Sequence, residues 1–240
     1  MLQCLDENIW VAEQPQKYFG LSIGTRMTVI RDQESCRLIV ISPIKPTLDL
    51  DEELSELGDV SDLVAPNSYH HLYCNEFKHR YPQAKLWGSS ALKRKCPDLL
   101  IDNLLMSAGP SPWAGIQICS LSGLKTMGPL GPSPLNEFAF CHVPSKTIVL
   151  TDSAFNFDYT FPWLTRFTTR IAGGYNRLEP TILERIASSD KDSLRKSIQE
   201  VLSWNFDRVI VAHGAVVEFG GKAMLTSAYS AFLGGTVGSV

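Results

Sequence analysis

The chain has 240 residues, of which 44% are hydrophobic and 20% are charged, with 22 Lys plus Arg against 25 Asp plus Glu. This is the composition of an ordinary globular chain, and it excludes fibrous and disordered proteins. The formal net charge of −3 provides no basic field for a phosphate backbone, so we expect no nucleic-acid partner.

The sequence predicts neither a membrane-spanning helix nor a secretory signal. No stretch approaches the roughly 20 consecutive apolar residues that a membrane-spanning helix needs, so we expect no membrane partner. Asp6 and Glu7 stand where a secretory signal would carry positive charge and then an apolar run. The 6 cysteines form no C-x-x-C pair, and a chain of this length needs no disulfides to bury a core. We expect a reduced, cytoplasmic protein, and the sequence leaves its oligomeric state open.

The first half of the chain predicts a strand meander followed by alternating strands and helices. Short β-rich apolar runs predict the meander strands, and leucines at helical spacing predict an amphipathic helix after them. The predicted elements are strands over 9–12, 27–30 and 38–41, a helix over 48–57, a strand over 60–65, a helix over 75–80, a strand over 84–87 and a helix from Ser90.

The second half begins with a Gly-, Pro- and Ser-rich stretch over 106–134, which predicts loop-rich surface around one strand at 115–120. Apolar patterning after it predicts further strands and helices. These are a hairpin of strands over 137–140 and 146–151, helices over 180–188 and 191–204, a strand over 206–214 and a closing helix over 221–232. No repeat-length period is visible, so we expect a single domain over 1–240.

An aromatic-rich segment over 153–177 interrupts this pattern. Its aromatic side chains more often belong to a core, and the alternative is an insertion that caps a pocket, because ligand clefts are mostly apolar. Its three arginines have two open interpretations. Guanidinium groups suit an anionic substrate, whereas ordinary surface charge is the favoured alternative. The three are Arg166, Arg170 and Arg177.

Three predicted strands end in side chains that bind metals in proteins. His70 and His71 follow the strand in VSDLVAPNSYHH, Asp152 ends TIVLTD, and His213 stands in VIVAHG. Active sites gather at strand ends because loops converge there over a rigid sheet. Three imidazoles and one carboxylate suit zinc, or iron with an open coordination position. We therefore expect these four residues to hold one ion.

Each of these residues also has a purely structural interpretation. His70 and His71 would then be partly exposed loop residues, Asp152 would cap a turn, and His213 would be a buried histidine before a glycine turn. His142 is a further candidate. A strand over 146–151, rising about 3.3 Å per residue, places it roughly 20 Å from Asp152. We interpret His142 as a turn residue.

The order of these motifs resembles that of the metallo-β-lactamase fold superfamily over most of the chain. Asp152 in LTDSAF is similar to the superfamily's metal-bridging Asp, and His213 in VAHG is similar to its terminal His. A narrower resemblance is to a branch of the superfamily known only as a domain of unknown function, and it is carried by HHLYCNEFKHRYPQAKLWGSSALKRKCPDL and HVPSKTIVLTDSAFNF. The resemblance implies an α/β (α+β) fold, namely a four-layer αββα sandwich.

The superfamily's first motif, H-x-H-x-D-H, is degenerate in this chain. Pro66 and Ser68 stand where its first two histidines are found, His70 replaces its Asp, and His71 matches its last His. Losing those two histidines removes most of one site of the usual metal pair. The resemblance therefore implies one ion, held by His70, His71, Asp152 and His213.

From this set we predict a mononuclear metal-dependent hydrolase that acts on a small intracellular substrate through a metal-activated water. The ion would be zinc, with iron as the alternative, and Asp152 and His70 would be the catalytic residues. Two other functions stay open. Pro66 and Ser68 at ligand positions favour a catalytically inactive binding module, and iron at the site would favour a redox enzyme.

Overall fold

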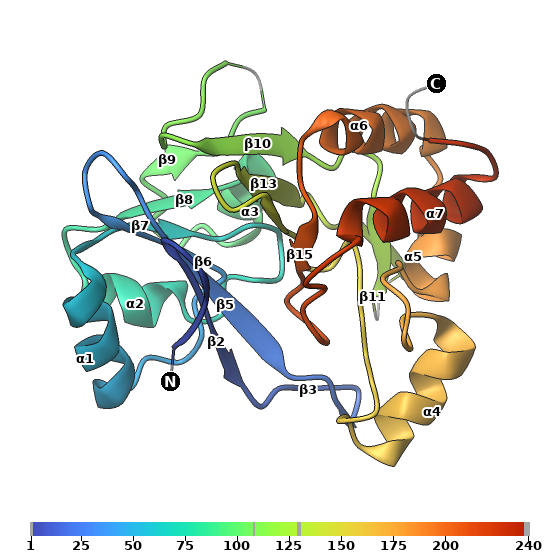
Figure 1. Ribbon diagram of the computed structural model, residues 1–240, viewed down its shortest axis with the longest axis horizontal. Coiled ribbons are helices and arrows are strands. Elements are labelled where there is room, and N and C mark those ends of the chain that lie inside the picture. The colour runs from blue at the N-terminus through green and yellow to red at the C-terminus, as the bar shows by residue number, and fades with distance from the viewer. Residues whose placement is uncertain (1, 108, 129–130, 238–240) are drawn as a thin grey trace.

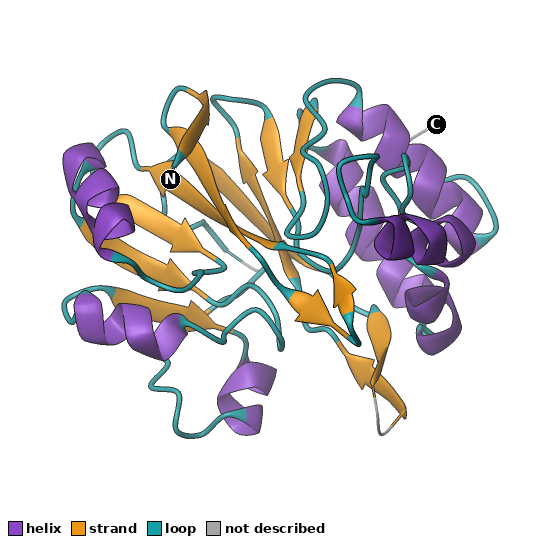
Figure 2. Cartoon of the chain, turned by 90° about the horizontal axis from the view of Figure 1, so that it is seen from below, coloured by secondary structure: helices purple, strands orange, loops and turns teal. Residues whose placement is uncertain are grey.

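A computed structural model describes residues 2–107, 109–128 and 131–237. Two β-sheets stack at the centre, and helices cover the outer face of each (Figure 1). Figure 2 shows the same layers from below, with strands between two groups of helices. The expected αββα sandwich is confirmed.

The larger sheet has the strand order β1-β2-β5-β6-β7-β8-β9. Its first strands pair antiparallel as a meander, and β6 to β9 are parallel, joined through helices. The strands are β1 (Gln3–Asp6), β2 (Ile9–Gln14), β5 (Thr25–Arg31), β6 (Leu38–Ile41), β7 (Val60–Val64), β8 (Lys85–Gly88) and β9 (Asn103–Leu104).

The smaller sheet has the order β10-β13-β14-β15. The pair β14 and β15 is parallel and the other pairs are antiparallel. Its strands are β10 (Ile116–Ser120), β13 (Phe138–His142), β14 (Thr147–Val149) and β15 (Arg208–Ile210). Two small hairpins lie outside the sheets, β3 (Lys17–Tyr18) with β4 (Leu21–Ser22), and β11 (Lys125–Gly128) with β12 (Gly131–Pro134). The sequence did not predict either hairpin.

The helices divide between the two sides of the sandwich. On the larger sheet lie α1 (Leu48–Leu57), α2 (Cys74–Arg80) and α3 (Ser90–Lys95), and on the smaller sheet lie α6 (Lys191–Ser203) and α7 (Gly221–Leu233). Two more helices, α4 (Trp163–Ala172) and α5 (Ile182–Ala187), extend below α7 in Figure 1. Among the described residues, no helix is both long enough and apolar enough to cross a membrane.

Three apolar layers hold these elements together. The middle layer joins the inner faces of the two sheets, with Ile39 and Ile41 on one side and Phe140 and Ile210 on the other. In the two outer layers, helices pack on the sheets. Phe77 lies in the layer on the larger sheet, and Tyr229 lies in the layer on the smaller sheet. Burial of this kind stabilises the folded state by about 25 cal/mol for each Å² of apolar surface removed from water. The sandwich is thus a rigid frame for the loops at its edge.

Candidate metal centre

Three side chains from three strand ends meet in one cluster. His70 Nε2 lies 3.2 Å from His213 Nε2, and Asp152 Oδ1 lies 3.4 Å from the Nε2 atom of each histidine. Ligand atoms that share one zinc ion tetrahedrally, at about 2.0 to 2.1 Å, are about 3.3 Å apart. The three atoms therefore already have the spacing of ligands around a common ion.

The topology explains why distant residues meet here. Strands β14 and β15 are parallel neighbours with Val149 opposite Ile210, so Asp152 and His213 leave the smaller sheet at the same edge. His70 comes from the loop after β7 of the larger sheet, whose carboxyl end faces the same edge. The cluster thus bridges the two sheets at the carboxyl ends of their strands.

Each histidine is oriented by a partner on its other ring nitrogen. The Nδ1 atom of His213 lies 2.6 Å from the carbonyl oxygen of Gly24, and Nδ1 of His70 lies 2.7 Å from Ser42 Oγ. A carbonyl oxygen only accepts hydrogen bonds, so Nδ1 of a neutral His213 carries the proton. Its Nε2 lone pair is then free to face the cluster, as in metal-binding histidines.

Asn67 ties the two ligand loops together from a fully buried position. Its Oδ1 accepts hydrogen bonds from the backbone N–H groups of Tyr69 and His70, both at 2.7 Å. Its Nδ2 donates to Asp152 Oδ2 at 2.7 Å and to Thr151 Oγ1 at 3.0 Å. The second carboxylate oxygen of Asp152 is therefore occupied, which leaves Oδ1 for the histidines.

The buried carboxylate of Glu137 holds the loop after β14 through hydrogen bonds to its backbone. It accepts hydrogen bonds from the backbone N–H groups of Thr151 and Asp152, both at 2.8 Å, and from Ser153 Oγ at 2.6 Å. Glu137 precedes β13, the antiparallel neighbour of β14, and so lies at the same sheet edge. It fixes the backbone from which Asp152 projects.

The electrostatics of the cluster favour a cation. Burial raises the pKa of Glu137, and the nearby Asp152 charge raises it further. Burial alone would raise the pKa of Asp152, but the charge of His70 and hydrogen bonds from His213 and His70 hold it well below its usual range. Burial alone would lower the pKa of His70, but the Asp152 charge, the hydrogen bond to Asp152 and the Glu137 charge together outweigh burial and raise it. The ionised Asp152 thus requires a proton or a metal ion beside it.

His71 does not join the cluster. Its Nε2 faces the sulfur of Cys96 at 3.7 Å, and burial together with the Lys95 charge lowers its pKa. His142, interpreted as a turn residue, ends β13 and pairs with Thr147 at the start of β14, away from the end that carries Asp152. The structure thus brings together three of the four expected ligands.

A cavity of ≈ 330 Å³ opens beside the cluster and includes all three ligand side chains in its wall. The rest of its lining is mostly apolar and comes from loops at the sheet edge, from the β3–β4 and β11–β12 hairpins, and from the 153–177 segment through Phe155, Phe157 and Ala172. No Lys or Arg occurs among the described residues that line it.

The three arginines of the 153–177 segment lie elsewhere. Arg170 stacks on the ring of Tyr175 at 3.9 Å, and Arg166 donates to the carbonyl oxygen of Tyr159 at 3.5 Å. Neither these two nor Arg177 is among the described residues that line the cavity. The anion-binding interpretation of these arginines therefore has no support from the cavity.

Several residues that build the site were not predicted from the sequence. Asn67 follows a strand and Pro66, which is a position typical of turn-forming Asn, so its place near the ligands had a local signal. Glu137 and Ser42 had none, because their contacts come from chain segments far away in sequence. Nothing in the residues around Gly24 indicates that its carbonyl would orient His213.

The comparisons with known proteins agree with this architecture. A family model described as Domain of unknown function (DUF4336) matches residues 6–171. The chain belongs to this family. The match includes His70 and Asp152 but ends before His213, so the DUF4336 region alone lacks one member of the cluster. No curated protein matches the chain.

The fold of this DUF4336 member is that of the metallo-β-lactamases. A metallo-β-lactamase from Pontibacter korlensis is similar with a TM-score of 0.63 at 12% identity, and the alignment covers 98% of each chain. One from Hirschia baltica gives 0.62 at 10% identity, with 97% of each chain covered. FIM-1 from Pseudomonas aeruginosa, in a mono-zinc form, gives 0.63 at 7% identity, with 97% of this chain and 96% of that one covered.

Proposed function

We propose that this protein is a hydrolase with one zinc ion held by His70, Asp152 and His213, acting on a small, uncharged and largely apolar molecule. The observation that carries the proposal is the triangle of ligand atoms, 3.2 to 3.4 Å on each side, in the wall of a cavity. Three protein ligands with one position left open are typical of catalytic zinc, whereas structural zinc has four.

The donor set suits a divalent ion in charge as well as in spacing. Two neutral imidazoles and one carboxylate leave about one positive charge on the ion. When bound, zinc would supply a Lewis acid for a substrate carbonyl and a lowered pKa for water. FIM-1, one of the similar folds, is described in a mono-zinc form, which supports a single ion in this architecture.

The chain's own residues would do the positioning. His70, Asp152 and His213 are the catalytic residues of the proposal, because they would hold the ion in the cavity wall where a substrate would bind. Asn67 and Glu137 would keep the Asp152 carboxylate aimed at it through the hydrogen bonds described above. Such outer-shell partners orient the ligand and tune its basicity.

The cavity lining indicates the substrate class. Away from the ion, a carboxylate or phosphate of the substrate would be buried without a cationic side chain beside it, because no Lys or Arg lines the described wall. An unpaired charge in such a place costs several kcal/mol. Esters, lactones or amides with an apolar group fit the site better than anionic substrates.

The same donor set favours a second candidate function. Two histidines and one carboxylate with open positions are also typical of non-haem iron(II) oxygenases. With His71 outside the cluster, this ligand count describes the site more closely than the four-ligand set expected from the sequence. Iron as the bound metal would support the redox enzyme in place of the hydrolase.

Metal analysis with matched variants tests the proposal. We expect one zinc per chain in the wild type and in His71→Ala, and a loss of at least about 100-fold in zinc affinity in His70→Ala. Ester hydrolysis would be assayed on neutral p-nitrophenyl esters and on the same esters with a terminal carboxylate. Its rate should rise and fall with the zinc content of each protein and should be higher for the neutral esters. Equal metal contents in all three proteins would contradict the proposed site, and a wild type that takes up no metal would favour the binding module.

A further inference from the structure

Helix α4 exposes its apolar face, in contrast to an ordinary surface helix. An amphipathic helix normally buries its apolar face against the protein. Here the buried residues are Thr165 and Thr169, whereas Trp163 and Ile171 are 70% and 71% exposed. Phe167 lies between these two along the same side and is also exposed. The apolar face of α4 therefore points away from the molecule.

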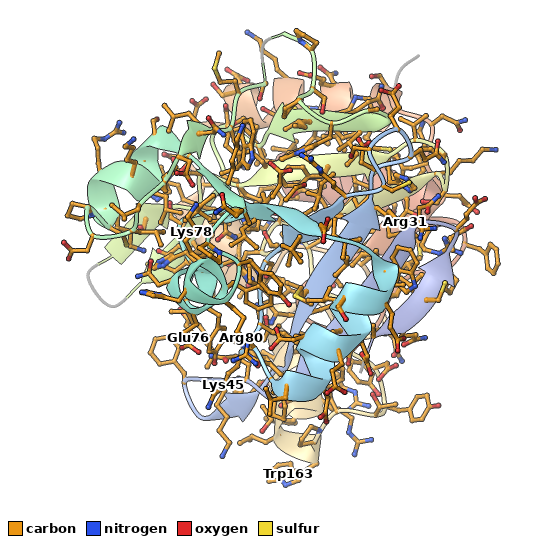
Figure 3. The ribbon with its side chains drawn as sticks, turned by 90° about the vertical axis from the view of Figure 1, so that its left-hand side faces the viewer. Arg31, Lys45, Glu76, Lys78, Arg80 and Trp163 are labelled. Carbon is orange, nitrogen blue, oxygen red and sulfur yellow. The ribbon has the colours of Figure 1, made fainter. Side chains whose placement is uncertain are left out.

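Specific contacts hold the helix in this orientation. Thr165 donates from its hydroxyl to the carbonyl oxygen of Ser22 at 2.9 Å, which fastens α4 to strand β4. Thr168, Thr169 and Ala172 form part of the cavity wall. The side of α4 that carries the threonines therefore faces the protein. On the opposite side, Trp163 lies at the lower end of the molecule in Figure 3.

Exposed apolar side chains also occur on the hairpin to which Thr165 fastens α4. On the neighbouring β3–β4 hairpin, Tyr18 and Phe19 are exposed, and their rings lie 4.5 Å apart. Tyr18 also lines the cavity, as does the exposed Leu183 of α5. We call the exposed side chains of α4 and the hairpin the apolar rim, and it consists of Tyr18, Phe19, Trp163, Leu164, Phe167 and Ile171.

The two elements that carry the apolar rim have a net charge opposite in sign to that of the whole chain. The hairpin and α4 carry Lys17, Arg166 and Arg170, and neither element contains Asp or Glu. The chain as a whole has a formal net charge of −3. Trp, Phe and Leu on one face of a helix with arginine beside them are typical of helices that lie in a membrane interface.

We propose that the apolar rim docks onto an anionic lipid surface, with Trp163, Phe167 and Ile171 entering the interface and the basic side chains facing lipid phosphates. The rim borders an apolar cavity, so docking would place the cavity mouth at the lipid surface. A second copy of the chain fits less well, because a two-fold interface would bring the same basic residues of both copies together. The sequence-based expectation of no membrane partner rested on spanning helices and did not address a short interfacial one.

Vesicle binding by the full chain tests this docking and does not require hydrolysis. We expect sedimentation with phosphatidylcholine vesicles that contain phosphatidylglycerol, much weaker sedimentation with phosphatidylcholine alone, and release at high salt. Phe167→Ser and Ile171→Ser should each weaken binding by about tenfold or more. Phe219→Ser is the matched control, because Phe219 is 79% exposed and lies outside the rim. Circular dichroism should show all three variants folded.

Two results would overturn the proposal. One is equal binding of the two rim variants, the control and the wild type to anionic vesicles, or binding by none of them. The other is a dimer in sedimentation velocity that Ile171→Ser dissociates, which would assign the rim to a second copy. Since metal is not needed for either measurement, failure here leaves the proposed hydrolase site untouched.

Discussion

The ligand residues are positioned by neighbours that would not touch the metal. Asp152 is held through its backbone N–H by Glu137 and through Oδ2 by Asn67, so its rotamer is fixed from two directions. A ligand fixed in this way pays little side-chain entropy when it binds an ion.

Replacing Glu137 by Gln should weaken zinc binding by about 10- to 100-fold. The amide would turn an NH₂ group toward one of the backbone N–H groups of Thr151 and Asp152, which both now find carboxylate oxygens. Isothermal titration with zinc would measure the loss. Glu184→Gln is the control. Glu184 is also buried in the cavity wall, but its hydrogen bonds are to Thr126 and Thr181, so the zinc affinity of this variant should equal that of the wild type.

Zinc affinity should rise with pH across the range in which His70 loses its proton. The Asp152 charge raises the pKa of His70 above its ordinary value of 6.5, so the metal-free protein holds a proton on this ring at higher pH than an ordinary histidine does. Only the neutral imidazole binds metal, so below that pKa the affinity should fall by about tenfold per pH unit. Calorimetry in buffers of different ionisation enthalpy should detect the released proton, and binding without proton release would contradict the account.

The sequence predicted all three residues of the cluster because each follows a buried strand. His70 and His71 have the same sequence context, so no local pattern distinguishes the ring that enters the cluster from the ring that turns to Cys96. The loop geometry that Asn67 imposes on the N–H groups of Tyr69 and His70 decides between them.

At the scale of elements, the loop after β15 depends on Gly214. Its φ is +107°, and a Cβ there would overlap the backbone of Asn156, which pairs with this loop. The neighbouring N–H of Ala215 donates to the Asn156 carbonyl at 2.7 Å. The close approach keeps His213 beside the segment that begins with Phe155, whose ring stacks on the imidazole.

Gly214→Ala should therefore lower the free energy of unfolding by about 2 to 4 kcal/mol and weaken metal binding with it. Gly220→Ala provides the comparison, because Gly220 also has a positive φ, +72°, but has open space around it. That substitution should cost only about 1 kcal/mol. Urea unfolding would measure both, and equal losses would show that the contact with Asn156 is unimportant.

Most elements with a clear hydrophobic period were predicted with small errors at their ends. The helix expected over 48–57 is found as α1 (Leu48–Leu57), and the strand expected over 38–41 as β6 (Leu38–Ile41). Helix α4 was not predicted, although its apolar residues Trp163, Phe167 and Ile171 recur at helical spacing. That spacing indicates a helix, but it does not reveal that the apolar face points outward and the threonines inward.

For the whole molecule, the αββα order was predictable from the alternation of strands and helices and from the resemblance that the motifs carry. The hairpins β3–β4 and β11–β12 were not, since each depends on contacts with α4 or α5 that are distant in sequence. These hairpins and helices surround the cavity, so the substrate-binding part is the least predictable region of this fold.

Metal should stabilise the whole fold, because the cluster joins loops from both sheets. An ion present at 100 times its dissociation constant adds about 2.7 kcal/mol, which for a chain of this size corresponds to a rise of about 5 to 10 °C in Tm. Differential scanning calorimetry with zinc and then with excess chelator would show the shift and its reversal. His70→Ala should melt at the same temperature under both conditions, and a zinc-dependent shift in that variant would place the ion elsewhere.

Anomalous diffraction at the zinc edge, from crystals grown with zinc, tests the central claim most directly. We predict one peak per chain, about 2.0 to 2.2 Å from His70 Nε2, His213 Nε2 and Asp152 Oδ1, with His71 outside the coordination sphere. A peak at other residues, or no peak while these three side chains stay in mutual contact, would contradict the account.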